Sequence, residues 1–127
     1  METQEIVRFT VGSGADARTY ELVAFLKEGE SSVRGEMVVG GGETLVKRAI
    51  ELNANLGEED GQFVLEHQDE IHSDFRGKFF LIFMGWRHPN MLFYVAYLGW
   101  DGDEWFQYWR SLYEGNWDMR CRLVRRV

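Results

Sequence analysis

Apolar and polar residues alternate with a period of two in the first third of the chain. The segments Glu5–Val11, Arg18–Lys27 and Val33–Val39 each gather apolar residues on one face, and turns rich in Gly and Ser separate them. This period is typical of β-strands, because successive side chains of a strand point to opposite faces. The pattern predicts three strands joined by hairpins.

The period changes after Gly40–Gly42. Apolar residues recur at helical spacing from Glu43 to Leu56, which predicts a helix over 43–56. Glu58–Gln68 fits a second, shorter helix, whereas Gly61 weakens it and leaves a strand at Gln62–Glu66 as the alternative. The middle of the chain therefore contains one or two helices.

The C-terminal half is the richest in aromatic and β-branched residues, which favour strands. Asp101-Gly102, between two of its apolar segments, is a strong hairpin signal. The predicted strands are Lys78–Trp86, Met91–Trp100, Glu104–Tyr113 and Asp118–Val127. We predict one α+β domain over residues 1–127, an antiparallel sheet of about seven strands curled around the helix. It comprises a three-strand N-terminal meander, the helical segment and a four-strand C-terminal meander.

Hairpin registers inferred from the turns divide the C-terminal meander into two faces. We expect the helix at 43–56 to cover the first face, which Arg110 alone interrupts. That face consists of Phe80, Ile82, Met84, Trp86, Met91, Phe93, Val95, Tyr97, Phe106, Tyr108, Leu112, Met119, Cys121 and Leu123.

The second face is also largely apolar, whereas a solvated sheet face would be polar. The N-terminal strands, a second protomer or a ligand would have to cover it. It carries Phe79, Leu81, Phe83, Leu92, Ala96 and Leu98 beside the residues that we predict as a ligand or partner surface. These are Tyr94, Trp100, Trp105, Gln107, Trp109, Arg120 and Arg122. Indole rings stack on planar groups and guanidinium groups bind anions, so a small ligand with a planar or anionic group fits this set.

Composition narrows the classes of partner. The 127 residues include 45% hydrophobic residues and a single cysteine, so the chain can fill a core without a disulfide. The net charge is −7, and residues 1–117 hold 10 Lys/Arg against 20 Asp/Glu. Such an acidic body opposes direct nucleic-acid or anionic-membrane binding. Without a signal peptide or a long apolar run, the sequence favours the cytoplasm.

Candidate catalytic or metal-binding chemistry is sparse. His67, Asp69, Glu70 and His72 are weak candidates for a metal site, but their spacing matches no zinc motif and a solvated connector is the competing interpretation. Gly40–Gly42 lacks the spacing of a phosphate-binding loop. Cys121 falls on the first face, where it is expected to be a buried hydrophobe. No motif predicts a cofactor or catalytic residue.

Three hypotheses from different classes follow. The first is a non-enzymatic binding or interaction domain, homodimeric or with a protein partner, that uses the aromatic face and the Arg120/Arg122 edge. The second is a small metal-dependent or acid–base hydrolase that uses the cluster from His67 to Asp74. The third is an acidic mimic of nucleic acid that blocks another protein.

Overall fold

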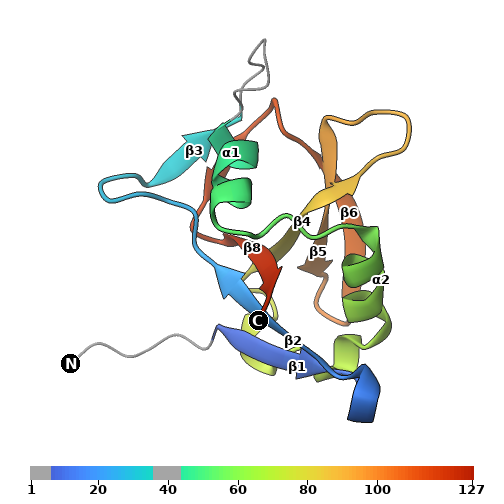
Figure 1. Ribbon diagram of the computed structural model, residues 1–127. Helices are drawn as coiled ribbons and strands as arrows, with labels where there is room; N and C mark the ends of the chain where they lie inside the picture. The colour runs from blue at the N-terminus through green and yellow to red at the C-terminus, as the bar shows by residue number, and fades with distance from the viewer. Residues whose placement is uncertain (1–6, 36–43) are drawn as a thin grey trace, which may run out of the picture.

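Eight strands form two sheets in the parts of the chain that the computed structural model describes, residues 7–35 and 44–127 (Figure 1). Two helices, α1 (Thr44–Glu51) and α2 (Glu58–Glu66), lie between the third and fourth strands, which confirms the α+β class. The strands are β1 (Arg8–Val11), β2 (Arg18–Val23), β3 (Ser32–Arg34), β4 (Phe80–Arg87), β5 (Tyr94–Trp100), β6 (Trp105–Ser111), β7 (Asn116–Asp118) and β8 (Cys121–Arg126). Short 3₁₀ turns lie at Gly14–Asp16 (η1), Gln68–Glu70 (η2) and Ser73–Phe75 (η3). No helix in these ranges is long and apolar enough to cross a membrane.

The last strands do not continue the C-terminal meander. The main sheet has the order β1-β2-β8-β4-β5-β6, and β8 runs parallel to β4. β7 instead pairs with β3 in a separate two-stranded sheet. The predicted single antiparallel sheet of about seven strands is therefore wrong in strand count and arrangement. Parallel neighbours need a long connection, which β5, β6 and β7 supply between β4 and β8.

Several predicted boundaries also change. β2 ends at Val23, before the predicted end at Lys27, and α1 ends at Glu51, before Leu56. The segment 58–68 contains a helix, α2, which decides between the two alternatives. Residues 36–39 of the third predicted strand lie outside the described residues, as do Gly40–Gly42.

Both faces of the main sheet carry buried clusters. On the first face, Ile82 and its neighbours pack with Leu45 of α1. On the second face, Leu81 and its neighbours pack with Val64 of α2 and with Phe75 from the turns that follow. The division into two apolar faces, predicted from the alternation along the strands, is confirmed by these two clusters.

The second face is covered from within the chain by α2 and the turns after it. Gly61 permits the contact, because a Cβ atom there would lie 2.3 Å from Cε3 of Trp86. Ile71 and Phe75 from the segment after α2 are fully buried against the sheet. The interpretation of this segment as a solvated connector is therefore wrong for its apolar residues.

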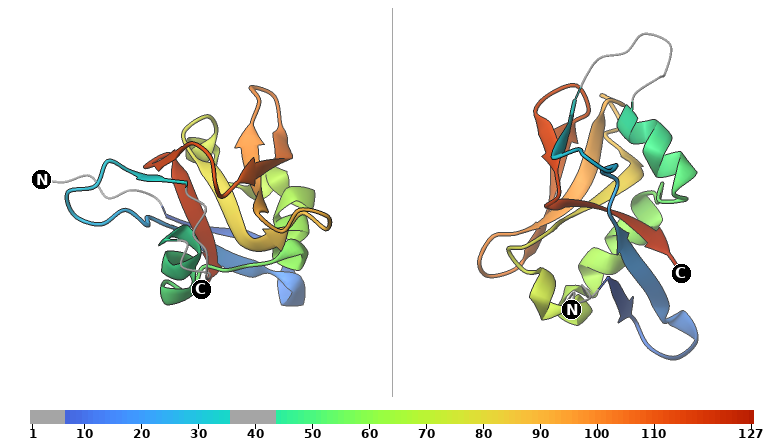
Figure 2. Two further views of the ribbon diagram at one scale, coloured as in Figure 1. Left: turned by 90° about the horizontal axis from the view of Figure 1, so that it is seen from above. Right: turned by 90° about the vertical axis from the view of Figure 1, so that its left-hand side faces the viewer.

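The turn η2 also contacts both edges of the main sheet (Figure 2). The side chain of Gln68 accepts a hydrogen bond from the backbone N–H of Trp105 in β6 at 2.8 Å and donates one to its carbonyl at 3.3 Å. Glu70 accepts a bond from the N–H of Gly12, which follows β1, at 3.0 Å. The sheet therefore curls around α2 and its turns, and the prediction that it curls around the helix at 43–56 is wrong.

Part of the face predicted as core is exposed. Phe106 and Tyr108 on β6 are 42% and 40% exposed, and Met91 and Met119 are exposed in connections. The cause is the short reach of α1, whose eight residues lie near β8 and β3 rather than over β6 (Figure 1). Trp86 changes face, because the β4–β5 register shifts near the end of β4 and turns its ring towards α2.

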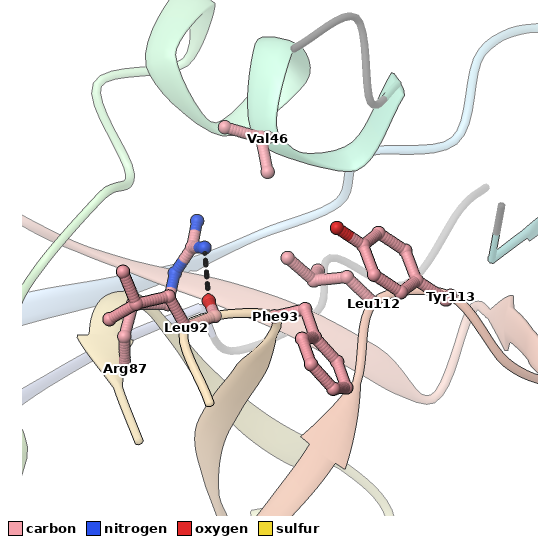
Figure 3. Close-up of a pocket in the computed structure, with 6 residues that line it drawn as sticks. All are labelled: Val46, Arg87, Leu92, Phe93, Leu112 and Tyr113. Atoms are coloured by element: carbon pink, nitrogen blue, oxygen red, sulfur yellow. Dashed lines mark hydrogen bonds between the residues drawn. The ribbon is translucent and has the colours of Figure 1, made fainter. Parts of the chain in front are cut away.

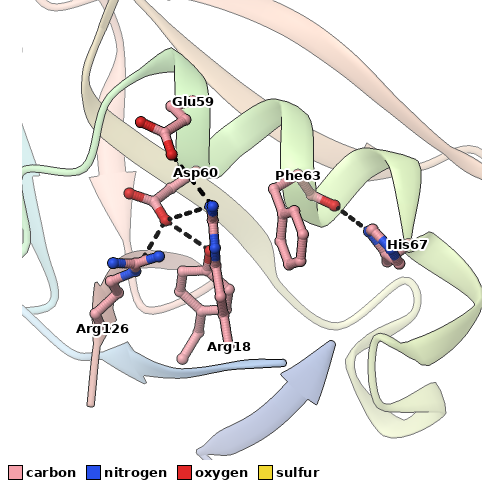
Figure 4. A network of polar contacts seen from close by, with 7 residues as sticks. Arg18, Glu59, Asp60, Phe63, His67 and Arg126 are labelled. Atoms are coloured by element: carbon pink, nitrogen blue, oxygen red, sulfur yellow. Dashed lines mark hydrogen bonds and ion pairs between the residues drawn. The ribbon is translucent and has the colours of Figure 1, made fainter. Parts of the chain in front are cut away.

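A polar network attaches the N-terminal end of α2 to the sheet (Figure 4). The carboxylate of Asp60 accepts a 2.6 Å hydrogen bond from the hydroxyl of Tyr20, which is fully buried on β2. Arg18 and Arg126 approach the same carboxylate oxygen at 3.3 Å and 3.1 Å. Glu59 adds an exposed pair with Arg18 at 3.2 Å. These contacts fix the helix that covers the second face.

Candidate functional site

The residues predicted as a ligand surface separate into distinct places. Trp105 is only 1% exposed and belongs to the core. Gln107 lies half-buried on β6, where its side chain donates to the carbonyl of Tyr108. The remaining members gather at the two ends of β5, and the structure does not bring all seven together.

At one end, Trp109 packs edge-on against Trp86 and against His88, with ring centroids 6.0 and 5.0 Å apart. Together with Tyr94 it borders an open depression beside Arg110. The aromatic side chains there are held by neighbours of the same chain, and the depression is too open to enclose a ligand.

At the other end, Trp100 and Arg120 line a small pocket, which we call the cation–aromatic pocket. Its volume is about 110 Å³. The lining residues are Gly77, Lys78, Phe79, Phe80, Trp100 and Arg120. The pocket forms where the connection into β4 meets the end of β5 and the turn before β8.

Four cationic side chains lie over the aromatic rings of this pocket. The guanidinium groups of Arg76, Arg120 and Arg122 lie 4.7, 5.8 and 4.5 Å from the ring centroids of Trp100, Phe80 and Phe79. The ammonium nitrogen of Lys78 lies 5.0 Å from the Phe79 ring. Such contacts are favourable because the face of an aromatic ring is negative. Arg122 is 6% exposed, so it supports the pocket from behind.

Arg120 is paired with a carboxylate. Its Nη2 lies 3.2 Å from Oδ2 of Asp118, and its backbone N–H donates to Oδ1 at 2.9 Å. Burial alone would raise the pKa of Asp118, but the hydrogen bonds from Arg120 bring the pKa below its ordinary value. Asp118 in turn raises the pKa of Arg120. The pair therefore stays ionised near neutral pH, and Asp118 competes with an anion for Arg120.

Arg76, Lys78 and Phe80 are site residues that the sequence prediction missed. Arg76 and Lys78 are exposed, and neither makes an ion pair within the described ranges. The signal was present in the run Arg76-Gly77-Lys78-Phe79-Phe80, where two cations directly precede two aromatic residues. Charge patterning of this kind can indicate a binding surface.

The candidate metal ligands have separate local roles. His67 bonds through Nδ1 to the carbonyl of Phe63 at 2.8 Å (Figure 4), and Glu70 is bonded to Gly12 as described above. Nδ1 of His72 accepts from the backbone N–H of Asp74 at 3.1 Å, and Asp69 is exposed. Over residues 7–35 and 44–127, no three His, Cys, Asp or Glu side chains converge to hold a metal ion.

A second pocket of about 260 Å³ lies between α1 and the β4–β5 connection (Figure 3). It is lined by Val46, Arg87, Leu92, Phe93, Leu112 and Tyr113. The guanidinium group of Arg87 points into it but donates to the carbonyls of Met84 and Leu92, both at 2.8 Å. Because these donors are already engaged, the pocket is less suited to an anion than the cation–aromatic pocket.

Cys121 is 1% exposed, and burial raises the pKa of its thiol. It is therefore a poor nucleophile.

No protein-family model, curated protein or solved structure matches this chain.

Proposed function

We propose that this domain is a non-catalytic binding module that captures an anionic group, carboxylate or phosphate, in the cation–aromatic pocket. The observation that carries the proposal is the gathering of Arg76, Lys78, Arg120 and Arg122 around three aromatic rings in a chain of net charge −7. Such a concentration of cations is not needed for solubility, which the acidic surface already provides.

The dimensions of the pocket limit what it binds. Its volume of about 110 Å³ is well below the roughly 300 Å³ at which pockets for whole drug-sized ligands begin. It therefore accepts one head group, while the rest of the ligand remains outside. Lys78 and Arg120 supply the charge, and the half-buried ring of Trp100 provides a surface for a planar group.

The pair between Arg120 and Asp118 sets the affinity. An anion must share the guanidinium group with a carboxylate that already bonds to it. Removal of that carboxylate leaves the cations in place and eliminates the competitor. Asp118→Asn should therefore strengthen binding, whereas removal of a cation should weaken it.

The test is isothermal titration of the full chain with phenyl phosphate and, separately, with benzoate. For these minimal probes we expect a Kd on the order of 1 mM for the preferred anion. Lys78→Ala should raise the Kd about threefold to fivefold, since an exposed ionic contact contributes up to about 1 kcal/mol. Asp118→Asn should lower the Kd by a similar factor. The two probes distinguish a phosphate from a carboxylate ligand.

Phenol and Lys47→Ala are the matched controls. Phenol keeps the ring but lacks the charge, and it should not bind measurably. Lys47 is exposed on α1 and does not line the pocket, so its substitution removes the same charge outside the pocket lining. Equal losses of affinity for the anion in Lys47→Ala and Lys78→Ala would mean that only the net charge of the chain determines binding. That result, or no binding of either anion, would refute the proposal.

A further inference from the structure

Among the described residues β6 is an edge strand of the main sheet, and apart from Arg110 and the covered ends of the strand it lacks the usual protections of an edge. All seven of its residues pair with β5 in one continuous register, without a bulge. The strand contains no Lys or Pro, and Phe106 and Tyr108 are exposed on it. Natural edge strands are commonly short, kinked or charged, because an open edge is a template for another strand.

The hydrogen bonds at the ends of β6 show which backbone groups point outwards. Leu112 donates to the carbonyl of Phe93 at 2.8 Å, and Asp101 donates to the carbonyl of Glu104 at 3.1 Å. Hydrogen-bonded pairs alternate along an antiparallel ladder, so the even-numbered residues of β6 bond to β5. The odd-numbered residues direct their N–H and C=O groups away from the sheet.

Of the four residues of β6 whose backbone groups point outwards, two are covered by other parts of the chain and two are accessible to another strand. Gln68 caps both backbone groups of Trp105, and Ser111 is buried at 7% exposure. Gln107 and Trp109 lie between them, half-buried, and no described residue bonds to their outward backbone groups. The open part of the edge is therefore a short segment centred on Tyr108.

Charge favours a second copy of this chain as the occupant. The chain carries −7 overall, yet residues 76–100 and 105–113 contain no Asp or Glu. These ranges include all of β4, β5 and β6. Two copies can therefore pair along β6 without placing one carboxylate directly opposite another, although Glu104 and Glu114 flank the strand.

We propose that two copies pair antiparallel through β6, with the two-fold axis at Tyr108. In this register Gln107 bonds with the partner's Trp109, and Phe106 lies opposite the partner's Arg110. Tyr108 faces the partner's Tyr108 in a non-hydrogen-bonded pair, the type in which side chains approach most closely. The interface is isologous, as a two-fold dimer requires. It goes beyond the proposed function and is independent of it, since no residue that lines the cation–aromatic pocket lies on β6.

The test is sedimentation velocity of the full chain over a broad concentration range, with a charge-swapped pair of variants. The guanidinium group of Arg110 lies over the ring of Trp117 in its own chain and donates to the carbonyl of Asn116. Phe106→Glu places a carboxylate at the position across from this charge of the partner, and Phe106→Lys places an ammonium group there. Both variants lose the same ring. We expect the dimer Kd of Phe106→Lys to exceed that of Phe106→Glu about tenfold, because the interface contains the contact twice. Repulsion between the net charges of the two molecules predicts the opposite order of Kd values, since Phe106→Glu makes the chain more acidic.

Tyr108→Lys and Tyr108→Glu test the position of the axis. Each places two like charges opposite each other, so both should weaken the dimer about tenfold or more. Thermal unfolding checks the fold of each variant, and if the Tyr108 variants do not fold, the Phe106 pair decides alone. A wild-type monomer at every concentration would overturn the proposal. A dimer whose Kd is unchanged by these substitutions, or equal for the two Phe106 variants, would overturn it as well.

Discussion

Substitution of Gly61 by alanine tests the packing of α2 on the second face of the sheet. In an exposed helix interior, Gly→Ala stabilises by about 1 kcal/mol, because alanine has the higher helix propensity. Here the new Cβ atom would lie 2.3 Å from Cε3 and 2.5 Å from Cζ3 of Trp86. Carbon atoms in ordinary contact are about 3.5–4.0 Å apart, so the helix or the ring must move by more than 1 Å.

The indole ring has little freedom to move. Trp86 is 4% exposed and packs edge-on against Phe83 and Trp109. Overpacking of a core costs about 1–3 kcal/mol, which exceeds the gain in helix propensity. We expect Gly61→Ala to lower the free energy of unfolding by about 1–2 kcal/mol. For a chain of this length that corresponds to a decrease in Tm of about 4–8 °C.

The assay is urea and thermal unfolding by circular dichroism, with Gln62→Ala as the matched control. Gln62 is exposed on the same helix, so its substitution should change stability by less than about 0.5 kcal/mol. In a Trp86→Phe background, where the larger ring is absent, Gly61→Ala should lose most of its cost. A rise in Tm for Gly61→Ala in the wild-type background would refute the close seating of α2 on β4.

Asp60, Glu30 and Cys121 each have a contact or a buried position that one experiment can test. In chemical denaturation, Asp60→Ala should lower the free energy of unfolding by about 2–3 kcal/mol, because it leaves a buried hydroxyl and two cations without their partner. The control Glu59→Ala, at an exposed position, should lower it by less than about 1 kcal/mol. Hydrogen bonding from Arg48 lowers the pKa of Glu30 from 4.5 to about 2, so Glu30 stabilises the fold above pH 4.5 and loses this contribution as the pH falls towards 2. The free energies of unfolding of Glu30→Gln and wild type should converge as the pH falls over this range. A difference that stays constant with pH would contradict the stabilising role of ionised Glu30. The Cys121 thiol should react with a disulfide reagent at pH 8 only as fast as the protein opens, and rapid reaction of the native protein would contradict its burial.

Local pattern predicted the faces of the central strands better than it predicted their partners. A turn centred on His88-Pro89 predicts Tyr97 opposite Phe80, and a turn centred on Asp101-Gly102 predicts it opposite Phe106. In the structure Tyr97 lies opposite Ile82 and Tyr108. Both errors are shifts of two residues, and side chains repeat with a period of two, so each residue remained on its predicted face. Only a shift by an odd number would have exchanged the faces, as the bulge does for Trp86.

The long-range pairings could not be predicted from local pattern. A short turn before β8 indicated a hairpin with β6, but β8 crosses the molecule and pairs with β2 and β4. The residues of the candidate site could likewise be predicted by type but not by their contacts. The sequence identified Trp100 as a stacking surface and Arg120 as an anion-binding group, whereas their contact through Phe80 depends on the parallel β4–β8 pairing. No turn signal encodes that pairing.

Labelling of the chain with fluorotryptophan allows ¹⁹F NMR to show whether an anion binds in the cation–aromatic pocket. Its five tryptophans include Trp100 at the pocket, Trp109 at the other end of β5, and the buried Trp105 and Trp117. Titration with phenyl phosphate should shift the Trp100 resonance, assigned with Trp100→Phe, and leave that of Trp109 in place. A shift of Trp109 while Trp100 stays unchanged would show that the anion binds outside the cation–aromatic pocket.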